Sequence, residues 1–396
     1  MIANSVAVLL AGGRSERVGM PKGLILVNGV TWLEHQVRTL RRAGIEKIVL
    51  VTGYFHSAYL ESVNSSHLNI DIVYNEKHEV GPFSSVQTGV SFCFQNYFNN
   101  SGILTSSISS AGISKAGISN AGISNAGVFI CPIDIPVAHR EVFQKLEEQL
   151  VSGVMAVVPI WKPLLSKQFF GSTVIARRGH PLLLSVEACL QVLALDGSHK
   201  SARLDLFLRG LSDLQKREVS VSDVRVLMNM NTVQDWKSLA PLMVDAPEAC
   251  LVPQNRERTS VVCVRDGKVL LVKARDPFSG CEYFFPPGGG LETDEDPSAA
   301  GIREVWEECG YEVEVDTPEC GYLDYLFSWN GVLYFLRTHL FVGTVVNESV
   351  EYVKPDADDL IGRRWVPVSD LKNVLGFHVA LCDMVTQLAQ HHNFEM

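Results

Sequence analysis

The sequence predicts a two-domain α/β protein: a doubly wound, mostly parallel sheet in an αβα sandwich, followed by a smaller mixed α/β sandwich. Its 396 residues, 46% hydrophobic and 20% charged, can form two ordinary hydrophobic cores. Short apolar strands alternate with amphipathic stretches between residues 5 and 242, which is typical of a parallel sheet. From residue 258 two strand pairs flank one helix, which is typical of a mixed sheet.

The first domain is expected over residues 1–242, a linker over 243–257 and the second domain over 258–396. The linker is predicted from two prolines and little periodicity. Residues 111–127 repeat with a period of five, and we interpret them as an expanded surface loop without function. The predicted elements are the strands 5–10, 47–54, 127–134 and 153–160, the helix 31–44, and the strand pairs within 258–275 and 332–346.

Composition limits the partners that the protein could have. A formal net charge of −10 argues against a broad electrostatic surface for nucleic acid or an anionic membrane. Nine cysteines without a CxxC pair favour reduced cysteines in a cytoplasmic protein. No basic N-terminal region and no apolar run of eighteen residues occur, so we expect neither a signal peptide nor a membrane span. The sequence leaves open whether the chain forms a homo-oligomer.

A glycine and lysine loop follows the first predicted strand. The segment LLAGGRSERVGMPKG (9–23) places two glycines directly after that strand, with Arg14, Arg17 and Lys22 beyond them. Glycines let backbone N–H groups approach an anion, and the three cations can neutralise a triphosphate and a leaving pyrophosphate. The segment has neither the GxxxxGK[ST] spacing of a P-loop nor the GxGxxG of a dinucleotide fold. It therefore predicts a phosphate site of another kind.

An acidic helix is predicted within PGGGLETDEDPSAAGIREVWEECGY (287–311). Asp296 and Pro297 form a helix start and Gly310 a helix stop, which predicts a helix over about 297–309. At 100° per residue, Ile302, Val305, Trp306 and Cys309 fall on one side, which we expect to face the core, and Glu304, Glu307 and Glu308 form an acidic face on the other. Carboxylates crowded on one face repel one another unless a divalent cation binds between them. The helix therefore predicts a Mg²⁺ or Mn²⁺ site that also suits a diphosphate.

The acidic segment resembles the Nudix box. Tyr311 is an aromatic residue where that family usually has an aliphatic one. The resemblance covers about 258–396 and implies a Nudix mixed α/β sandwich that hydrolyses a nucleoside diphosphate linked to another group. The matching positions are Gly289, Glu295, Arg303, Glu304, Val305, Glu307, Glu308 and Gly310.

The Nudix resemblance also implies roles for single residues. Glu295 would support the site, and Arg303 would orient the glutamates through paired hydrogen bonds. A separate loop often supplies the general base in this family; Asp356, Asp358 and Asp359 are the candidates, and we choose Asp359. The implied metal ligands are Glu304, Glu307, Glu308, which is also a catalytic residue, and the carbonyl of Gly288.

The glycine and lysine loop resembles the LAGGxSxRMGxxK signature of the MobA-like nucleotidyltransferases, with Val18 in place of methionine. The resemblance covers about 4–242 and implies a Rossmann-like domain that transfers a nucleotide from a nucleoside triphosphate to a phosphorylated small-molecule acceptor, with Mg²⁺ or Mn²⁺. Further similar segments are IVLVTGY (48–54), YNEKHEVGPFSSVQTGV (74–90), FICPIDIP (129–136), GHPLLLS (179–185) and NMNTVQDW (229–236).

This second resemblance assigns binding roles by position. Lys22 and Arg17 would hold the triphosphate and stabilise charge in the transition state, and Asp134 would bind the metal with Asn231 or, less favoured, Asn229. Val233 and Gln234 replace the Pro-Glu pair of the family's closing motif without touching the implied metal positions. The nucleotide and acceptor contacts would come from Gly12, Gly13, Gly81, Ser84, Ser85 and, near the acceptor, His180.

Three interpretations of the whole chain remain open. In the first, the first domain transfers a nucleotide to a molybdopterin-like phosphate and the second hydrolyses a nucleotide diphosphate compound. In the second, the acceptor is a sugar or polyol phosphate. In the third, the first domain binds nucleotide only to regulate the hydrolase. The nucleobase of the triphosphate also stays undecided. The segments LAGG and KGL resemble guanylyltransferases, whereas SSV and GHPLLLS resemble cytidylyltransferases.

Overall fold

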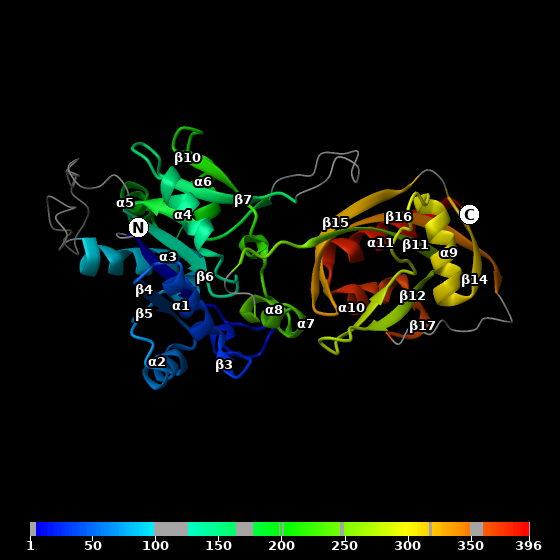
Figure 1. The fold of residues 1–396 in the computed structure, drawn as a ribbon, viewed down its shortest axis with the longest axis horizontal. Coiled ribbons are helices and arrows are strands. Elements are labelled where there is room, and N and C mark those ends of the chain that lie inside the picture. The colour runs from blue at the N-terminus through cyan, green and yellow to red at the C-terminus, as the bar shows by residue number, and fades with distance from the viewer. Residues whose placement is uncertain are drawn as a thin grey trace. The chain divides into compact units, whose positions relative to one another are not determined.

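The computed structural model describes residues 5–98, 126–163, 177–197, 199, 202–245, 249–316, 319–348 and 359–395 (Figure 1). Most of the repeat at 111–127, together with Asp356 and Asp358, lies outside the described residues. The chain forms two compact units. The first comprises Met1–Leu164, Thr173–Val233 and Met243–Val252, and the second comprises chiefly Gln234–Leu242 and Pro253–Met396.

The first unit is built on a mostly parallel sheet with the strand order β10-β7-β9-β6-β1-β4-β5. Its strands are β1 (Val6–Ala11), β4 (Lys47–Thr52), β5 (Asp71–Tyr74), β6 (Gly127–Pro132), β7 (Ala156–Trp161), β9 (Leu182–Ser185) and β10 (Lys216–Val221). A short strand, β8 (Arg177–Arg178), also pairs with β7. Strands β2 (Leu26–Val27) and β3 (Val30–Thr31) form a separate two-stranded sheet. Strands β6, β1, β4 and β5 pair in parallel, as do β7 and β10. Strand β9 is antiparallel to β6 and β7.

Helices cover both faces of this sheet. The helices of this unit are α1 (Trp32–Arg42), α2 (His56–Ser65), α3 (Pro82–Cys93), α4 (Arg140–Gln149), α5 (Val186–Ala194) and α6 (Leu204–Gly210). The chain continues with α7 (Val233–Ser238), most of which belongs to the second unit, and α8 (Ala240–Asp245), which is divided between the two units. Val8 and Val51 pack with residues of α3 and α5 on one face. Phe129 of β6 packs edge-on against Phe143 of α4 on the other face, with ring centroids 4.9 Å apart. The predicted doubly wound sheet is therefore confirmed.

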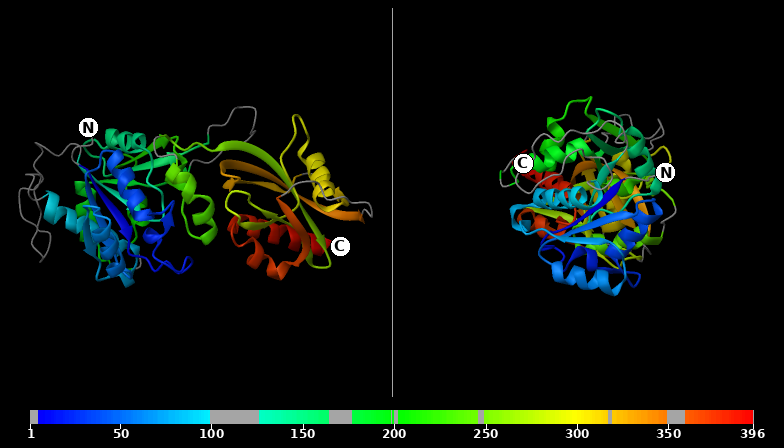
Figure 2. Two further views of the ribbon diagram at one scale, coloured as in Figure 1. Left: turned by 60° about the horizontal axis from the view of Figure 1, so that its bottom comes forward. Right: turned by 90° about the vertical axis from the view of Figure 1, so that its left-hand side faces the viewer.

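The second unit contains a mixed sheet with the order β13-β12-β11-β16-β14, in which β15 also pairs with β16 and β17 with β12. The strands are β11 (Gln254–Arg265), β12 (Lys268–Arg275), β13 (Glu282–Phe285), β14 (Tyr311–Val315), β15 (Gly321–Trp329), β16 (Val332–Glu348) and β17 (Leu360–Pro367). Strand β11 is parallel to β16 and antiparallel to β12, so the predicted mixed sheet is confirmed. Helix α9 (Pro297–Cys309) covers one face, and α10 (Leu371–Leu375) and α11 (Val379–Glu395) cover the other (Figure 2).

The acidic helix forms where the sequence predicts it. Asp296 is the N-cap and accepts hydrogen bonds from the backbone N–H groups of Ser298 and Ala299, and Gly310 ends the helix at φ 65°. One detail of the prediction is wrong: the side chains of Ile302 and Trp306 are exposed, by 41% and 42%. The buried face instead consists of Ala300, Gly301, Val305 and Cys309, because the small residues Ala300 and Gly301 allow close contact with β11.

All nine cysteines are free thiols, and all but Cys250 and Cys320 are buried. This agrees with the predicted reduced core cysteines. Within the described part of the chain, no helix combines the length and the apolar character that a membrane crossing needs.

Helix α3 depends on a glycine for its distance from the sheet. A Cβ atom on Gly89 would lie 2.4 Å from Cγ1 of Val8 and 2.9 Å from Cγ2 of Val51. We expect Gly89→Ala to lower the free energy of unfolding of the first unit by about 1–3 kcal/mol, as overpacking does in other cores. Denaturant unfolding followed by circular dichroism measures the change.

The matched control is Gly210→Ala at the end of α6, where an added Cβ meets no atom within 4 Å. This variant should stay within about 0.5 kcal/mol of the wild type, as surface substitutions usually do. Equal stability of the Gly89→Ala protein and the wild type would contradict the tight packing of α3.

Candidate active sites

The first candidate site lies at the carboxyl ends of β1, β4 and β6, where ligands bind in open α/β sheets. A cavity of about 650 Å³ opens there. Its lining includes Gly12, Gly13, Arg14, Arg17, Lys22, Tyr54, Tyr59, His78, Gly81, Ser85 and Asp134. The volume suffices for a nucleotide-sized ligand.

Lys22 joins the predicted metal-binding residues of this cavity. Its Nζ atom donates to Oδ2 of Asp134 at 2.8 Å and to Oδ1 of Asn231 at 3.0 Å. Arg17 donates to the same Asn231 oxygen at 3.1 Å. The backbone N–H of Met230 donates to the carbonyl of Asp134 at 2.9 Å, which ties the two segments together. The structure thus brings Arg17, Lys22, Asp134 and Asn231 together from three distant parts of the chain.

The carboxylate of Asp134 and the amide oxygen of Asn231 already converge on one cation, the Lys22 ammonium. Carboxylate and amide oxygens are also the donors that Mg²⁺ prefers. This donor set therefore fits a divalent cation, with Lys22 as its neighbour or substitute.

The glycine loop is held against α3. A Cβ atom on Gly12 would lie 2.8 Å from Oγ of Ser85, and one on Gly53 would lie 2.6 Å from the carbonyl oxygen of Gly12. Both positions therefore need glycine for close backbone approach. No atom lies within 4 Å of the position of a Cβ on Gly13, so that residue faces open space in the cavity lining.

Ser84 and Ser85 differ in what they can offer a ligand. Asn75 donates from its Nδ2 atom to Oγ of Ser84 at 2.8 Å and to Oγ of Ser85 at 3.0 Å. The Ser84 hydroxyl also donates to the carbonyls of Lys77 and Gly81, so it holds the loop before α3. Ser85 and Gly81 line the cavity, whereas Ser84 does not.

His180 lies apart from the cavity lining. Its side chain is buried beside Cys131 and Pro132, and burial lowers its pKa, which favours the neutral ring. Its Nδ1 atom has no hydrogen-bond partner among the described residues. The structure therefore does not bring His180 into the group around Lys22.

Three ring-bearing residues that the sequence did not assign to the site, Tyr54, Tyr59 and His78, also line the cavity. The guanidinium of Arg14 lies 4.8 Å from the ring centroid of Tyr54, which meets the ring of His78 edge-on at 4.3 Å. The Tyr59 hydroxyl accepts from the backbone N–H of Gly23, and burial raises the pKa of Tyr59 to about 12. Tyr54 ends the segment IVLVTGY and His78 lies within YNEKHEVGPFSSVQTGV, so both could have been found from those motifs.

The second candidate site is organised by Arg303 on α9. Its Nε and Nη2 atoms donate to the two carboxylate oxygens of Glu295 at 2.9 and 3.0 Å. Its Nη1 atom donates to Glu304 at 2.9 Å and to Glu307 at 3.1 Å. The paired hydrogen bonds lower the pKa of Glu295. One guanidinium therefore holds three of the predicted carboxylates in a fixed arrangement.

Glu308 has a pKa far above the usual value of a carboxyl group. Burial raises its pKa to about 8, against the opposing effect of a hydrogen bond from the backbone N–H of Gly288 at 2.9 Å. The neighbouring charges of Glu304 and Asp359 raise it further, and burial raises the pKa of Glu304 as well. Such a crowd of oxygen donors fits a divalent cation, which would stabilise all of them in the ionised form.

Glycines bring the turn before α9 against its neighbours. A Cβ atom on Gly288 would lie 2.1 Å from the carbonyl oxygen of Thr259, and one on Gly289 would lie 2.2 Å from Oε1 of Glu304. The carbonyl of Gly288, a predicted metal ligand, accepts a hydrogen bond from Arg258 at 2.7 Å. The turn can therefore adopt this position only with glycines at both places.

The acidic residues contribute to the lining of a cavity of about 310 Å³. Asp359, immediately before β17, lines it together with Glu304, Glu307 and Glu308. Its lining also includes residues that the sequence did not point to: Arg256, Arg258, Phe285, Phe327, Trp329, Tyr334 and Leu336. The rings of Phe327 and Trp329 lie nearly parallel, at 22°, with centroids 6.2 Å apart. They sit at adjacent same-face positions of β15, a pattern that alternation along the strand could have shown.

Both units match families of known proteins. Residues 7–213 match the family model described as a MobA-like NTP transferase domain, and residues 254–381 match the one described as a NUDIX domain. In the structural comparison, a nucleotidyl transferase from Methanothermobacter shares 19% identity, with 59% of this chain and 94% of that chain covered and a TM-score of 0.39.

Curated relatives match the second unit. The human diphosphoinositol polyphosphate phosphohydrolase NUDT4B is 31% identical over 131 residues, which cover 31% of this chain and 64% of the relative. The mouse diphosphoinositol polyphosphate phosphohydrolase 3-alpha is 33% identical over 130 residues, which cover 31% of this chain and 71% of the relative. The chain thus spans less than two thirds of the first of these relatives.

The raised pKa of Glu308 predicts how stability depends on pH without metal. Between pH 4.5 and about 8, folded protein keeps a proton on Glu308 that unfolded protein has released, so stability falls as the pH rises. We expect Glu308→Gln to flatten this decline in EDTA-treated protein. Denaturant unfolding of the second unit at a series of pH values measures it.

Glu307→Gln is the matched control, because the Glu307 side chain on the same helix is 46% exposed. This variant should keep the wild-type dependence on pH. If the stability of the Glu308→Gln variant fell as steeply with rising pH as that of the wild type, a buried protonated Glu308 would be excluded.

Proposed function

Because the chain belongs to the MobA-like NTP transferase family and carries a NUDIX domain in its second unit, we propose that it is a bifunctional nucleotide enzyme. The first site would transfer a nucleotide from a nucleoside triphosphate to a phosphorylated acceptor. The second would hydrolyse a nucleoside diphosphate linked to another group. The observation that carries the proposal is the same in both units: one basic side chain gathers the oxygen donors of a predicted metal site beside a cavity.

In the first site, Arg14, Arg17 and Lys22 would hold the triphosphate and neutralise its charge. Asp134 and Asn231 would hold Mg²⁺, which when bound supplies positive charge at the phosphates. An oxygen of the acceptor phosphate then attacks the α-phosphorus, and the bond to the β-phosphate breaks as pyrophosphate leaves. Positioning and charge neutralisation do most of this work.

The acceptor is proposed to be a molybdopterin-like phosphate, on the resemblance of GHPLLLS (179–185) to the acceptor segment of such transferases. His180 of this segment lies buried outside the nucleotide cavity, in a small cavity that shares the lining residue Pro132 with it. A sugar or polyol phosphate is the alternative acceptor. A first unit that only senses nucleotide and regulates the hydrolase is the alternative role.

In the second site, Glu304, Glu307 and Glu308 would hold Mg²⁺, which when bound polarises the phosphate and lowers the pKa of a coordinated water. Asp359 lines the same cavity and would accept the proton of the attacking water. Water adds to phosphorus, and the bond to the bridging oxygen breaks. Arg303 would act by orienting the glutamates.

The lining of the second cavity favours a nucleotide as its substrate. Beside the four carboxylates that would surround the metal, two cationic side chains, Arg256 and Arg258, line it, which offers few contacts to a heavily phosphorylated inositol. Phe285, Phe327, Trp329 and Tyr334 instead provide aromatic surface on which a nucleobase can stack. We therefore propose a nucleoside diphosphate compound in place of the diphosphoinositol polyphosphates that the curated relatives are named for.

For the transferase, we expect Lys22→Ala to lower adduct formation at least about 100-fold, because the variant loses a cation that contacts the migrating charge. The assay combines each nucleoside triphosphate, Mg²⁺ and either molybdopterin or a sugar 1-phosphate. It uses the Glu308→Gln background, in which the hydrolase cannot remove the product.

Lys372→Ala, an exposed lysine of the second unit, should leave the transfer rate unchanged. If no triphosphate and acceptor yield an adduct, the transferase proposal fails. If Lys22→Ala changes only the affinity of the hydrolase for nucleotide, the regulatory alternative replaces it.

For the hydrolase, we expect Trp329→Ala to raise KM for nucleoside diphosphate compounds by about tenfold with little change in kcat, since stacking on one aromatic ring contributes about 1–3 kcal/mol. Trp306→Ala, on the exposed surface of α9, is the matched control and should keep the wild-type KM. Faster turnover of a diphosphoinositol polyphosphate, with no effect of Trp329→Ala, would refute a nucleotide substrate.

A further inference from the structure

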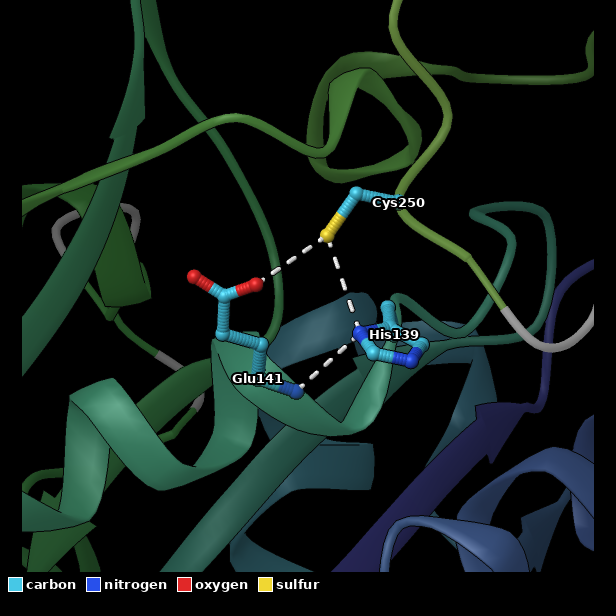
Figure 3. A group of neighbouring side chains, drawn as sticks. All are labelled: His139, Glu141 and Cys250. Carbon is cyan, nitrogen blue, oxygen red and sulfur yellow. Dashed lines mark hydrogen bonds between the residues drawn. The ribbon is translucent and has the colours of Figure 1, made fainter.

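Three potential metal-binding side chains meet outside both candidate active sites. His139 precedes α4, Glu141 lies in the first turn of that helix, and Cys250 lies in the segment that follows α8 (Figure 3). One ligand atom from each residue lies within 4.8 Å of the others. All three side chains are partly exposed, so an ion can reach them.

A buried ion pair holds these residues in place. Asp223 and Arg225 are almost wholly buried, with a separation of 2.8 Å between Oδ2 and Nη2. Asp223 accepts from the backbone N–H of His139 at 2.7 Å and from that of Leu251 at 3.4 Å. Arg225 donates to the carbonyl of Ala249 at 2.7 Å. The same pair therefore fixes both His139 and the backbone on either side of Cys250.

Two of the three distances between the ligand atoms match those of a zinc site. Zn–S distances of about 2.3 Å and Zn–N or Zn–O distances of about 2.0–2.1 Å place two ligand atoms of a tetrahedral site about 3.5 Å apart. Here Sγ of Cys250 lies 3.6 Å from Nδ1 of His139 and 3.5 Å from Oε2 of Glu141. Only small movements would bring the three atoms onto one ion.

The charges also suit a zinc ion. A thiolate from Cys250 and a carboxylate from Glu141 together balance the two positive charges of Zn²⁺. Lys145 binds Oε1 of Glu141 at 2.6 Å and leaves Oε2 directed at the thiol. Zinc binding would displace the thiol proton of Cys250. His139 would give up its long 3.4 Å hydrogen bond from the backbone N–H of Glu141. A set of sulfur, nitrogen and one oxygen selects zinc over magnesium.

We propose that His139, Glu141 and Cys250 bind one Zn²⁺ ion, which fastens the chain segment around Cys250 to the start of α4 in the first unit. A water molecule would complete the coordination. This site is independent of the proposed nucleotide chemistry, because none of its ligands lines either cavity.

The test is a zinc titration of the reduced, metal-stripped full-length protein in excess Mg²⁺, which occupies sites made of oxygen alone. We expect one tightly bound Zn²⁺ per chain and at least tenfold weaker binding by Cys250→Ser and by His139→Gln. Cys320→Ser, the other cysteine that is not buried, should bind zinc as the wild type does. Co²⁺ in place of zinc should show thiolate-to-cobalt charge-transfer absorption that Cys250→Ser lacks.

A second measurement needs no variant, so it decides the matter even if a substitution prevents folding. Iodoacetamide should alkylate Cys250 in the metal-free protein, and Zn²⁺ should protect it, as read by mass spectrometry of the Cys250 peptide. Equal zinc affinity of Cys250→Ser and the wild type, no zinc binding under these conditions, or no protection of Cys250 would overturn the proposal.

Discussion

Both candidate sites depend on one physical interaction: a single basic side chain that gathers oxygen donors from separate parts of the chain. Lys22 does so for Asp134 and Asn231, and Arg303 does so for Glu295, Glu304 and Glu307. Without a nearby positive charge, these donors would repel one another or take up protons. Glu308 shows the effect of such crowding, because burial, together with the neighbouring charges of Glu304 and Asp359, raises its pKa to about 8.

The two folds supply this interaction in different ways. In the first unit, parallel strands bring their carboxyl ends to one edge, so that residues 112 positions apart, Lys22 and Asp134, meet there. In the second unit, one helix turn supplies the glutamates, and a glycine turn brings backbone groups against them. Close packing of glycines, at Gly12 against Ser85 and at Gly289 against Glu304, is the condition that both arrangements share.

The sequence predicted what depends on local patterns. Helix α9 runs from Pro297 to Cys309 as expected, because its N-cap and its terminal glycine are encoded within fifteen residues. The exposure of Ile302 and Trp306 was not predicted, since helical periodicity does not show that Ala300 and Gly301 pack closest to the sheet. The reversed strand β9 and the meeting of Cys250 with His139 arise from contacts between distant segments, which a single sequence does not reveal.

The most direct test of this account is a crystal structure of the protein with Mg²⁺ and an unreactive nucleoside triphosphate analogue. We expect the Lys22 ammonium to leave Asp134 and contact the triphosphate, while Asp134 and Asn231 turn their oxygens to the metal. An analogue bound in the cavity with Lys22 still within hydrogen-bond distance of Asp134, and with no metal on Asp134 or Asn231, would contradict the central claim that the basic side chain holds these donors ready for substrate and metal.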